Sequence, residues 1–519
     1  MPDGACVTSV DHLIVGAGTA GAILAARLSE DPARRVLVLE AGPDYPDETA
    51  LPESLRDSYR TPFGSHDWNL QVTVCQGRQG LMPRGKVVGG SSQTNGAGVV
   101  RAPAADFDAW AGLGLPAWSW ERVLPSYCRL EADQQFGDRG YHGAAGPIPI
   151  TRWSRDELLP PMAGFLDATL AAGHPFCEDL NSPKAMGIGP YPQNRRGRVR
   201  MSTNLAYLSP ARARPNLTVR GGVTVDRVVI RAGRAVGVEA RGEVIAAHEV
   251  ILCAGAPFSA ALLLRSGIGP AEDLRRVGVP PLVDLPGVGT GLVDQPGAVI
   301  PVMPAAGAGG AADSPTLQLV ARLAAFPGHT PDHAFYLCLF AGVDLVNGPS
   351  PALAAMIGAP VANLVMVGDM RIASRGRVVL RGPNPTEPPS VDLRFYTAEG
   401  DLDRMRAAYR HAWEIANHAA FTATVMGFAL VDDDLVADDD RLDALLRMGT
   451  QSRTSLLGGC RMGPAGDPLA VVDEHCRVRD VEGLRVVDAS IVPLALRTVP
   501  ALTCMMLGEH VAAWVAAGV

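Results

Sequence analysis

A glycine-rich hexapeptide, Gly16-Ala17-Gly18-Thr19-Ala20-Gly21, directly follows an apolar run and precedes an Ala/Leu-rich stretch. The glycines allow a tight turn and a close approach of the backbone to a pyrophosphate, while a helix N-terminus supplies free N–H groups. Glu40 ends the next apolar run, where its carboxylate can accept hydrogen bonds from ribose hydroxyls. Together these residues predict a dinucleotide site, but they do not separate FAD from NAD.

The order of elements around this motif predicts how it is positioned. Residues 12–15, 22–28 and 36–39 are typical of a strand, a helix and a second strand, the βαβ unit of a parallel sheet. Residues 217–252 alternate between apolar and polar side chains, which predicts antiparallel hairpins. A further strand at 484–487 and a helix at 501–517 close the chain. Because the βαβ pieces lie at both ends, the nucleotide domain is expected to be discontinuous.

A second glycine-rich stretch runs from Arg84 to Gly96. With the first motif and several other segments, it resembles the glucose–methanol–choline (GMC) family of FAD-dependent oxidoreductases. The segments that carry the resemblance follow the family order from residue 12 to residue 490: Gly16–Gly21 with Glu40–Gly42, Gly85–Asn95, Trp118–Pro125, His142–Pro147, Arg214–Leu217, Cys253–Gly269, Cys460–Gly463 and Leu484–Ser490.

The resemblance implies which residues contact FAD. The first glycine turn would hold the pyrophosphate, Glu40 the adenosine ribose, and Val225 the adenine through its backbone. Asp488 and Ala489 would close over the phosphates and the ribityl chain. The complete expected set is Gly16, Gly18, Thr19, Ala20, Gly21, Glu40, Ala41, Arg84, Val88, Gly90, Ser91, Asn95, Gly96, Ala97, Val225, Cys253, Ala254, Gly255, Asp488, Ala489 and Pro500.

The resemblance also implies an α/β fold (α+β overall), with a Rossmann-like FAD-binding domain and a mixed-sheet, helix-backed substrate domain. The expected FAD-binding domain comprises residues 1–150, 196–300 and 446–519, and the substrate-binding domain residues 151–195 and 301–445. Some family members tether FAD through a His just before the Asn of the second glycine-rich stretch. Thr94 stands at that position, so FAD is expected to bind non-covalently.

The chain departs from the family at the redox site. The family places a His five residues before the Cys-Arg-Met-Gly motif, because an alcohol must lose its proton to a base while hydride leaves for flavin N5. Ser455 occupies that position, and an unactivated hydroxyl is a poor base. A second His or Asn is expected farther on, where Thr498 or Pro500 stands, depending on the position of a one-residue gap.

Other side chains are candidates for the lost role. Arg497 could hold a carboxylate, a phosphate or a developing alkoxide by charge, although a surface or core-edge role is equally consistent. His66 lies in a segment that runs toward the flavin in this family and is a candidate proton acceptor. Asn95, expected beside the isoalloxazine, completes the candidate catalytic set.

These departures leave alternative functions open. The first is an FAD-dependent oxidoreductase acting on a CH–OH or related donor, with a small-molecule substrate and with dioxygen or another electron acceptor. The second is non-standard FAD chemistry of lyase or decarboxylase type, with a carboxylate held by Arg497. The third is a redox-inactive FAD protein. Only the catalytic pair is lost, whereas the FAD-binding motifs are intact. This pattern favours a changed reaction over a general loss of function.

Composition excludes several classes. Lys and Arg number 46 against 54 Asp and Glu, and no block of basic residues occurs, which argues against nucleic acid as a partner. The nine cysteines are scattered, which predicts no disulfide framework and no metal site and suits a reducing cytoplasm. No signal peptide or membrane span is expected, since long apolar runs are absent. The Pro/Ala/Gly-rich segment 301–313 is predicted to be a mobile loop.

Overall fold

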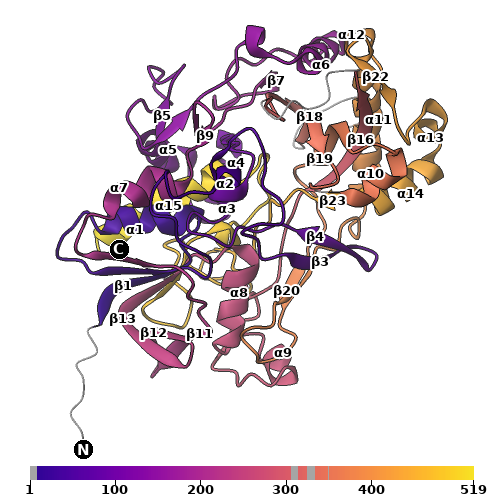
Figure 1. The fold of residues 1–519 in the computed structure, drawn as a ribbon. Coiled ribbons are helices and arrows are strands. Elements are labelled where there is room, and N and C mark those ends of the chain that lie inside the picture. Colours follow the sequence, from indigo (N-terminus) through magenta and orange to yellow (C-terminus); the bar gives the residue numbers. More distant parts are fainter. Residues whose placement is uncertain (1–8, 306–313, 324–333, 349) are drawn as a thin grey trace, which may run out of the picture.

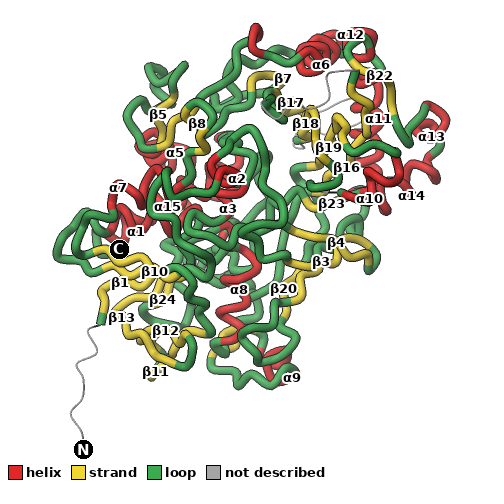
Figure 2. Tube along the Cα trace, viewed as in Figure 1, coloured by secondary structure: helices red, strands yellow, loops and turns green. Residues whose placement is uncertain are grey.

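The computed structural model describes residues 9–305, 314–323, 334–348 and 350–519. Two large sheets dominate the molecule, with long loops running between them (Figures 1 and 2). The predicted fold class, a Rossmann-like part combined with a second, helix-backed part, is confirmed. Among the described residues, no helix combines the length and the apolar character needed to cross a membrane.

The first sheet is built on the predicted βαβ unit. Its strand order is β10 (Leu217–Arg220), β2 (Val36–Leu39), β1 (Val10–Val15), β13 (Glu243–Leu252), β12 (Arg234–Ala240) and β11 (Arg227–Arg231), with β24 (Leu484–Val486) also paired to β13. The strands β10, β2, β1, β13 and β24 pair in parallel. Residues 13–15 and 36–39 are buried, as expected for strands covered on both faces.

The segment 217–252 differs in part from its prediction. β11, β12 and the first half of β13 form the expected antiparallel hairpins. β10, however, pairs in parallel with β2, and the second half of β13 pairs in parallel with β1. Alternation of side chains reports the pleat of a strand but not its partner, so these long-range pairings were not visible in the local pattern.

The second sheet has the order β22 (Val425–Phe428), β16 (Pro296–Pro304), β19 (Val361–Asp369), β18 (Phe335–Asp344), β17 (Leu319–Leu323) and β7 (Gly187–Pro190), with β23 (Gln451–Ser452) paired to β16. All of its pairings are antiparallel. Residues 301–304 of the predicted loop belong to β16, and residues 306–313 lie outside the described ranges.

Smaller sheets complete the strand set. A mixed sheet joins β20 (Arg377–Val379), β21 (Ser390–Asp392), β3 (Leu70–Cys75) and β4 (Arg78–Met82). Two-stranded pairs are β5 with β6 (Glu131–Asp133, Ile148–Ile150), β8 with β9 (Arg195–Arg196, Val199–Arg200) and β14 with β15 (Ile268–Gly269, Val283–Asp284).

Helices cover both large sheets. α1 (Thr19–Leu28) and α15 (Ala501–Ala516) lie side by side beside the first sheet although they come from opposite ends of the chain (Figure 1). α11 (Asp401–Ala416) packs on β19. The remaining α-helices are α2 (Glu53–Arg56), α3 (Ser91–Thr94), α4 (Ala104–Gly112), α5 (Trp120–Leu130), α6 (Pro160–Ala171), α7 (Ser209–Ala211), α8 (Ala256–Arg265), α9 (Ala271–Arg276), α10 (Pro351–Ile357), α12 (Ala419–Thr422), α13 (Asp433–Ala437) and α14 (Asp439–Gly449). Short 3₁₀ helices lie at Pro116–Trp118, Arg155–Glu157 and Ala489–Ile491, and a π-helix at Asn204–Leu208.

Candidate active site

A cavity of about 1500 Å³ extends from the ends of the parallel strands of the first sheet to the face of the second sheet. Open α/β sheets bind their ligands at this edge, outside the carboxyl ends of the strands. The expected site residues that line the cavity are Gly16, Gly18, Thr19, Ala20, Glu40, Ala41, Arg84, Gly90, Ser91, Asn95, Gly96, Val225, Cys253, Ala254, Gly255, Ser455, Asp488, Ala489 and Pro500.

The first glycine turn connects β1 to α1 at one end of the cavity. Gly16 has a φ of 99°, and a Cβ there would lie 2.6 Å from the Cys253 carbonyl oxygen, so the turn needs a glycine. Glu40 is buried, and its carboxylate accepts the N–H groups of Ala17 (3.0 Å) and Gly42 (2.9 Å). Burial raises the pKa of Glu40 to about 7, against the opposing effect of these hydrogen bonds.

The second glycine-rich stretch lies directly against the first. Gly90 has a φ of 52°, and a Cβ there would lie 2.7 Å from the Gly18 Cα. Both backbones therefore meet at the cavity wall with no room for a side chain. Asn95 follows α3, and its Oδ1 accepts the N–H of Ala97 at 2.9 Å. Thr94 also lines the cavity.

Three helix N-termini face the same cavity. The residues that begin α1 (Gly18 and Thr19), α8 (Gly255 and Ala256) and α15 (Pro500 and Ala501) all line it. No side chain caps any of these helices. The first N–H groups of α1 and α15 therefore remain available to an anion, whereas at α8 the Gly255 N–H already donates to Asp488. The glycine backbones, the open helix ends and the buried carboxylate of Glu40 suit a pyrophosphate-linked dinucleotide.

Asp488 joins the end of β24 to the start of α8. Its Oδ2 accepts the N–H of Gly255 at 2.8 Å and the hydroxyl of Ser259 at 2.5 Å, and its Oδ1 accepts the N–H of Ser490 at 2.8 Å. The carboxylate therefore fixes the position of the loop that lines the cavity.

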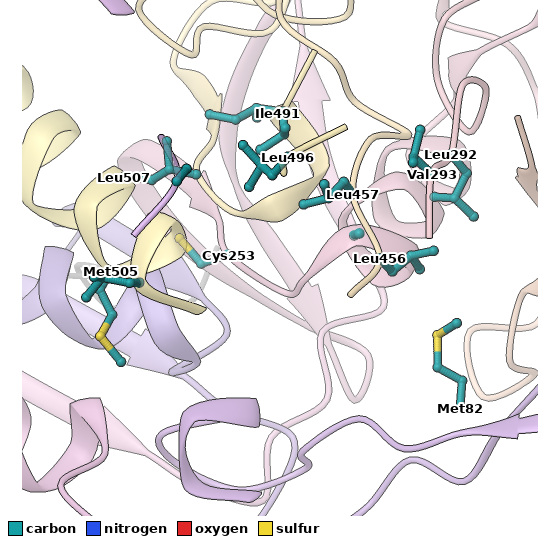
Figure 3. Packing of buried hydrophobic residues seen from close by; sticks show 14 of the residues in the cluster. Met82, Cys253, Leu292, Val293, Leu456, Leu457, Ile491, Leu496, Met505 and Leu507 are labelled. Carbon is teal, nitrogen blue, oxygen red and sulfur yellow. The ribbon is translucent and has the colours of Figure 1, made fainter. Parts of the chain in front are cut away.

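Ser455 lies on the loop after β23, where the family's histidine is expected. Leu457 anchors the loop, because its backbone exchanges two hydrogen bonds with the backbone of Val293. The side chains of Leu292, Val293, Leu456 and Leu457 belong to the same buried cluster (Figure 3). The Ser455 N–H donates to Asp294 at 2.9 Å, whereas its hydroxyl has only a long bond to the Arg453 carbonyl, 3.4 Å.

Of the residues that the structure describes, none with a basic side chain hydrogen-bonds the hydroxyl of Ser455 through that side chain. Asp294 is occupied by the Ser455 N–H and by the hydroxyl of Ser452, and burial raises its pKa. Among the described residues, no histidine lines the cavity, and no group of histidines, cysteines and carboxylates is arranged to hold a metal ion.

Three expected cofactor residues lie behind the lining. A Cβ at Gly21 would lie 2.1 Å from the Gly16 carbonyl oxygen, so this glycine serves the close packing of α1 on the turn. Val88 is fully buried, and its N–H donates to the Pro43 carbonyl at 3.0 Å. Ala97 is also fully buried. None of the three side chains lines the cavity.

Three candidate catalytic residues also lie outside the lining. His66 bonds through Nε2 to the Tyr45 hydroxyl at 2.8 Å, and burial lowers its pKa. Thr498 is buried, and its hydroxyl pairs with that of Tyr336 at 2.5 Å. Arg497 forms an ion pair with Asp106 of α4 at 3.3 Å. The side chain of Arg497 thus serves an ion pair outside the lining, and its role as a ligand of a substrate anion stays a prediction.

Arg453 lines the cavity and was missed by the sequence reasoning. Its position two residues before Ser455 was the available signal. Asp294 was missed as well, because it is distant in sequence from the loop that it anchors.

Comparisons with known proteins agree with this architecture. Profiles of the GMC oxidoreductase family match residues 10–297 and 373–508. An uncharacterized GMC-type oxidoreductase of Rhodococcus erythropolis is 36% identical over 511 residues, 97% of each chain. An oxygen-dependent choline dehydrogenase of Brucella melitensis is 35% identical, covering 93% of this chain and 91% of the relative.

Among solved structures, pyridoxine 4-oxidase from Mesorbium loti superimposes with a TM-score of 0.87 at 29% identity, covering 98% of this chain and 99% of that chain. The two family profiles together match most of the sequence, and the Rhodococcus relative covers 97% of it. The chain therefore belongs to the GMC oxidoreductases, a family of FAD-binding flavoproteins.

Proposed function

We propose that this FAD-dependent GMC oxidoreductase binds FAD non-covalently and oxidises a CH–OH or related donor without a histidine base. The observation that carries the proposal is one cavity lined by the glycine turns, Glu40, the N-termini of α1, α8 and α15, and Ser455. Bound FAD supplies the hydride acceptor of the reaction. The relatives named for choline and pyridoxine oxidation act on alcohols and support the same reaction class.

The chain's own residues perform the remaining tasks. Glu40 and the glycine turns orient the cofactor, and Asp488 fixes the loop at the start of α8. Ser455 can hydrogen-bond a substrate hydroxyl but cannot take its proton. General-base catalysis contributes roughly 10²–10⁴-fold, so ordinary alcohols should react slowly, and a substrate with a more acidic hydroxyl or its own base is favoured.

A dark, anaerobic titration of the holoenzyme tests this function. We expect at least one member of a panel of alcohols, aldehydes and hydroxy acids to bleach the oxidised flavin absorbance, because hydride transfer reduces the flavin. A flavin that is bound but never bleaches would contradict the proposal. It would favour non-standard chemistry on a carboxylate, for which illumination with carboxylic acids is the next measurement.

We expect acid denaturation to release all of the FAD into solution. Thr94 stands where some relatives carry the tethering histidine, and a threonine hydroxyl cannot replace that bond. The measurement is flavin fluorescence of the protein band after denaturing electrophoresis, beside the free-flavin fluorescence of the supernatant. A fluorescent protein band would contradict non-covalent binding.

A further inference from the structure

Arg453 is an incompletely partnered cation at the substrate end of the cavity. Its Nε and one terminal nitrogen are buried with no hydrogen-bond partner, and none of the described carboxylates forms an ion pair with it. Each of the other lining cations has a partner: Arg60 the Gly342 carbonyl, Arg84 the Thr454 carbonyl, Arg265 the Glu387 carbonyl, and Lys86 the ring face of Trp68. Arg84 and Arg265 also have a buried Nε without a partner, whereas Arg453 has two such nitrogens.

Two paired glycines make room for this side chain. Gly297 of β16 and Gly368 of β19 are register partners in the second sheet. A Cβ at Gly297 would lie 2.8 Å from the Arg453 Cγ, and one at Gly368 would lie 2.7 Å from its Cδ. The aliphatic stem therefore lies flat across two neighbouring strands, which directs the guanidinium along the cavity wall. The Arg453 N–H donates to the Gln295 carbonyl at 3.0 Å and fixes the start of the stem.

Within the part of the chain that the structure describes, no carboxylate forms an ion pair with the guanidinium. Its central carbon lies 5.9 Å from the ring centre of Tyr336. It also contacts the buried Cys338 thiol, whose pKa is raised by burial, so the thiol stays neutral. The nearby lining includes the apolar side chains of Phe340, Met366 and Val499. A cation buried among such groups is costly unless an anion pairs with it.

We propose that Arg453 is the anion subsite of the substrate cavity and binds a carboxylate of the substrate. Each unpartnered N–H group of the guanidinium can donate a charge-assisted hydrogen bond to a carboxylate oxygen. This subsite rests on the proposed function. If the enzyme oxidises a CH–OH donor, the carboxylate at Arg453 makes that substrate a hydroxy acid with an apolar body. It also separates this chain from its choline-oxidising relatives, because a quaternary ammonium would meet a like charge here.

Binding of three probes of similar shape to the holoenzyme tests the subsite without turnover. The probes are benzoate, neutral benzamide and the trimethylphenylammonium cation, each titrated by calorimetry near neutral pH. We expect benzoate to bind about 10- to 100-fold more tightly than benzamide, the range for hydrogen bonds to a charged group. The cation is expected to bind more weakly than benzamide.

The variants locate the effect. Arg453→Met should abolish the preference for benzoate, and Arg453→Lys should retain part of it. Gly368→Ala should reduce it by displacing the stem. Arg60→Met is the control: it removes another cation of the cavity, one that donates to the Gly342 carbonyl, and it should leave the preference for benzoate unchanged. Flavin absorbance and melting temperature monitor folding of each variant.

Two results would overturn the subsite. One is equal binding of benzoate and benzamide to the wild-type holoenzyme, which needs no variant. The other is a full benzoate preference in Arg453→Met. The outcomes also separate this proposal from the proposed function. Benzoate binding through Arg453 without any flavin bleaching removes only the redox function, whereas bleaching by alcohols without a benzoate preference removes only the subsite.

Discussion

Gly90→Ala is expected to weaken FAD binding at least about a hundredfold, equivalent to about 3 kcal/mol. Gly90 has a φ of 52° and a ψ of −140°, a conformation that costs other residues about 1–3 kcal/mol. The added Cβ would also lie 2.7 Å from the Gly18 Cα. Since that atom belongs to the backbone of the other glycine turn, it cannot swing aside like the end of a flexible side chain. The two turns that line the cavity must separate.

The measurement is a fluorescence titration of the apoprotein with FAD, with the melting temperature recorded in parallel. Gly233→Ala is the matched control. Gly233 has a φ of 77° in the β11–β12 hairpin, and a Cβ there would meet nothing within 4 Å. The substitution Gly233→Ala imposes backbone strain, but the added Cβ clashes with nothing and lies away from the cavity. FAD affinity should therefore stay near the wild-type value. Wild-type affinity in Gly90→Ala would show that the two turns do not meet as described.

Much of the FAD-side geometry was predictable because it depends on local rules. A glycine turn between a strand and a helix, followed by an acidic residue at the end of the next strand, limits where Gly16, Gly18 and Glu40 can lie. Gly21 and Val88 also lie within the two glycine-rich stretches, although they pack behind the cavity lining. The motif alone therefore did not distinguish lining residues from supporting ones.

The substrate side was less predictable, because the direction of a long side chain depends on distant partners. From the sequence, Arg497 was predicted as an anion ligand, whereas Arg453 was missed. Asp106 of α4 pairs with Arg497, whereas the paired glycines of β16 and β19 direct Arg453 into the lining. Neither contact has a local signature. β10 shows the same limit, because its parallel partner β2 belongs to the N-terminal βαβ unit and is distant from β10 in the sequence.

FAD affinity of the apoprotein is expected to rise about tenfold per pH unit up to about pH 7 and to level off above it. Burial raises the pKa of Glu40 to about 7, so the carboxyl is largely protonated below that pH. Ribose hydroxyls donate to the ionised form, so binding below pH 7 must release a proton. Calorimetric titrations with FAD across this range, in buffers of different ionisation enthalpy, measure both the affinity and the released proton.

Glu40→Gln should remove this pH dependence and weaken FAD binding about a hundredfold above pH 7, the scale of lost hydrogen bonds to a charged group. Glu239→Gln is the control, since Glu239 pairs with Arg227 on β11, away from the cavity, and should keep the wild-type profile. A pH dependence that survives in Glu40→Gln would assign the proton to another group.

The stability of the apoprotein should change with pH in the opposite sense to its FAD affinity. The pKa of Glu40 in the folded state lies above the value of about 4.3 for an unfolded chain, so the folded state binds the extra proton between these values. The Glu40 contribution to the free energy of unfolding is therefore full below about pH 4 and is lost as the pH rises through about 7. Bound FAD should remove this pH dependence of the free energy of unfolding, because it favours the ionised carboxylate of Glu40. Urea unfolding of the apo and holo forms between about pH 4 and pH 7 therefore tests the protonation of Glu40 independently of the affinity measurement.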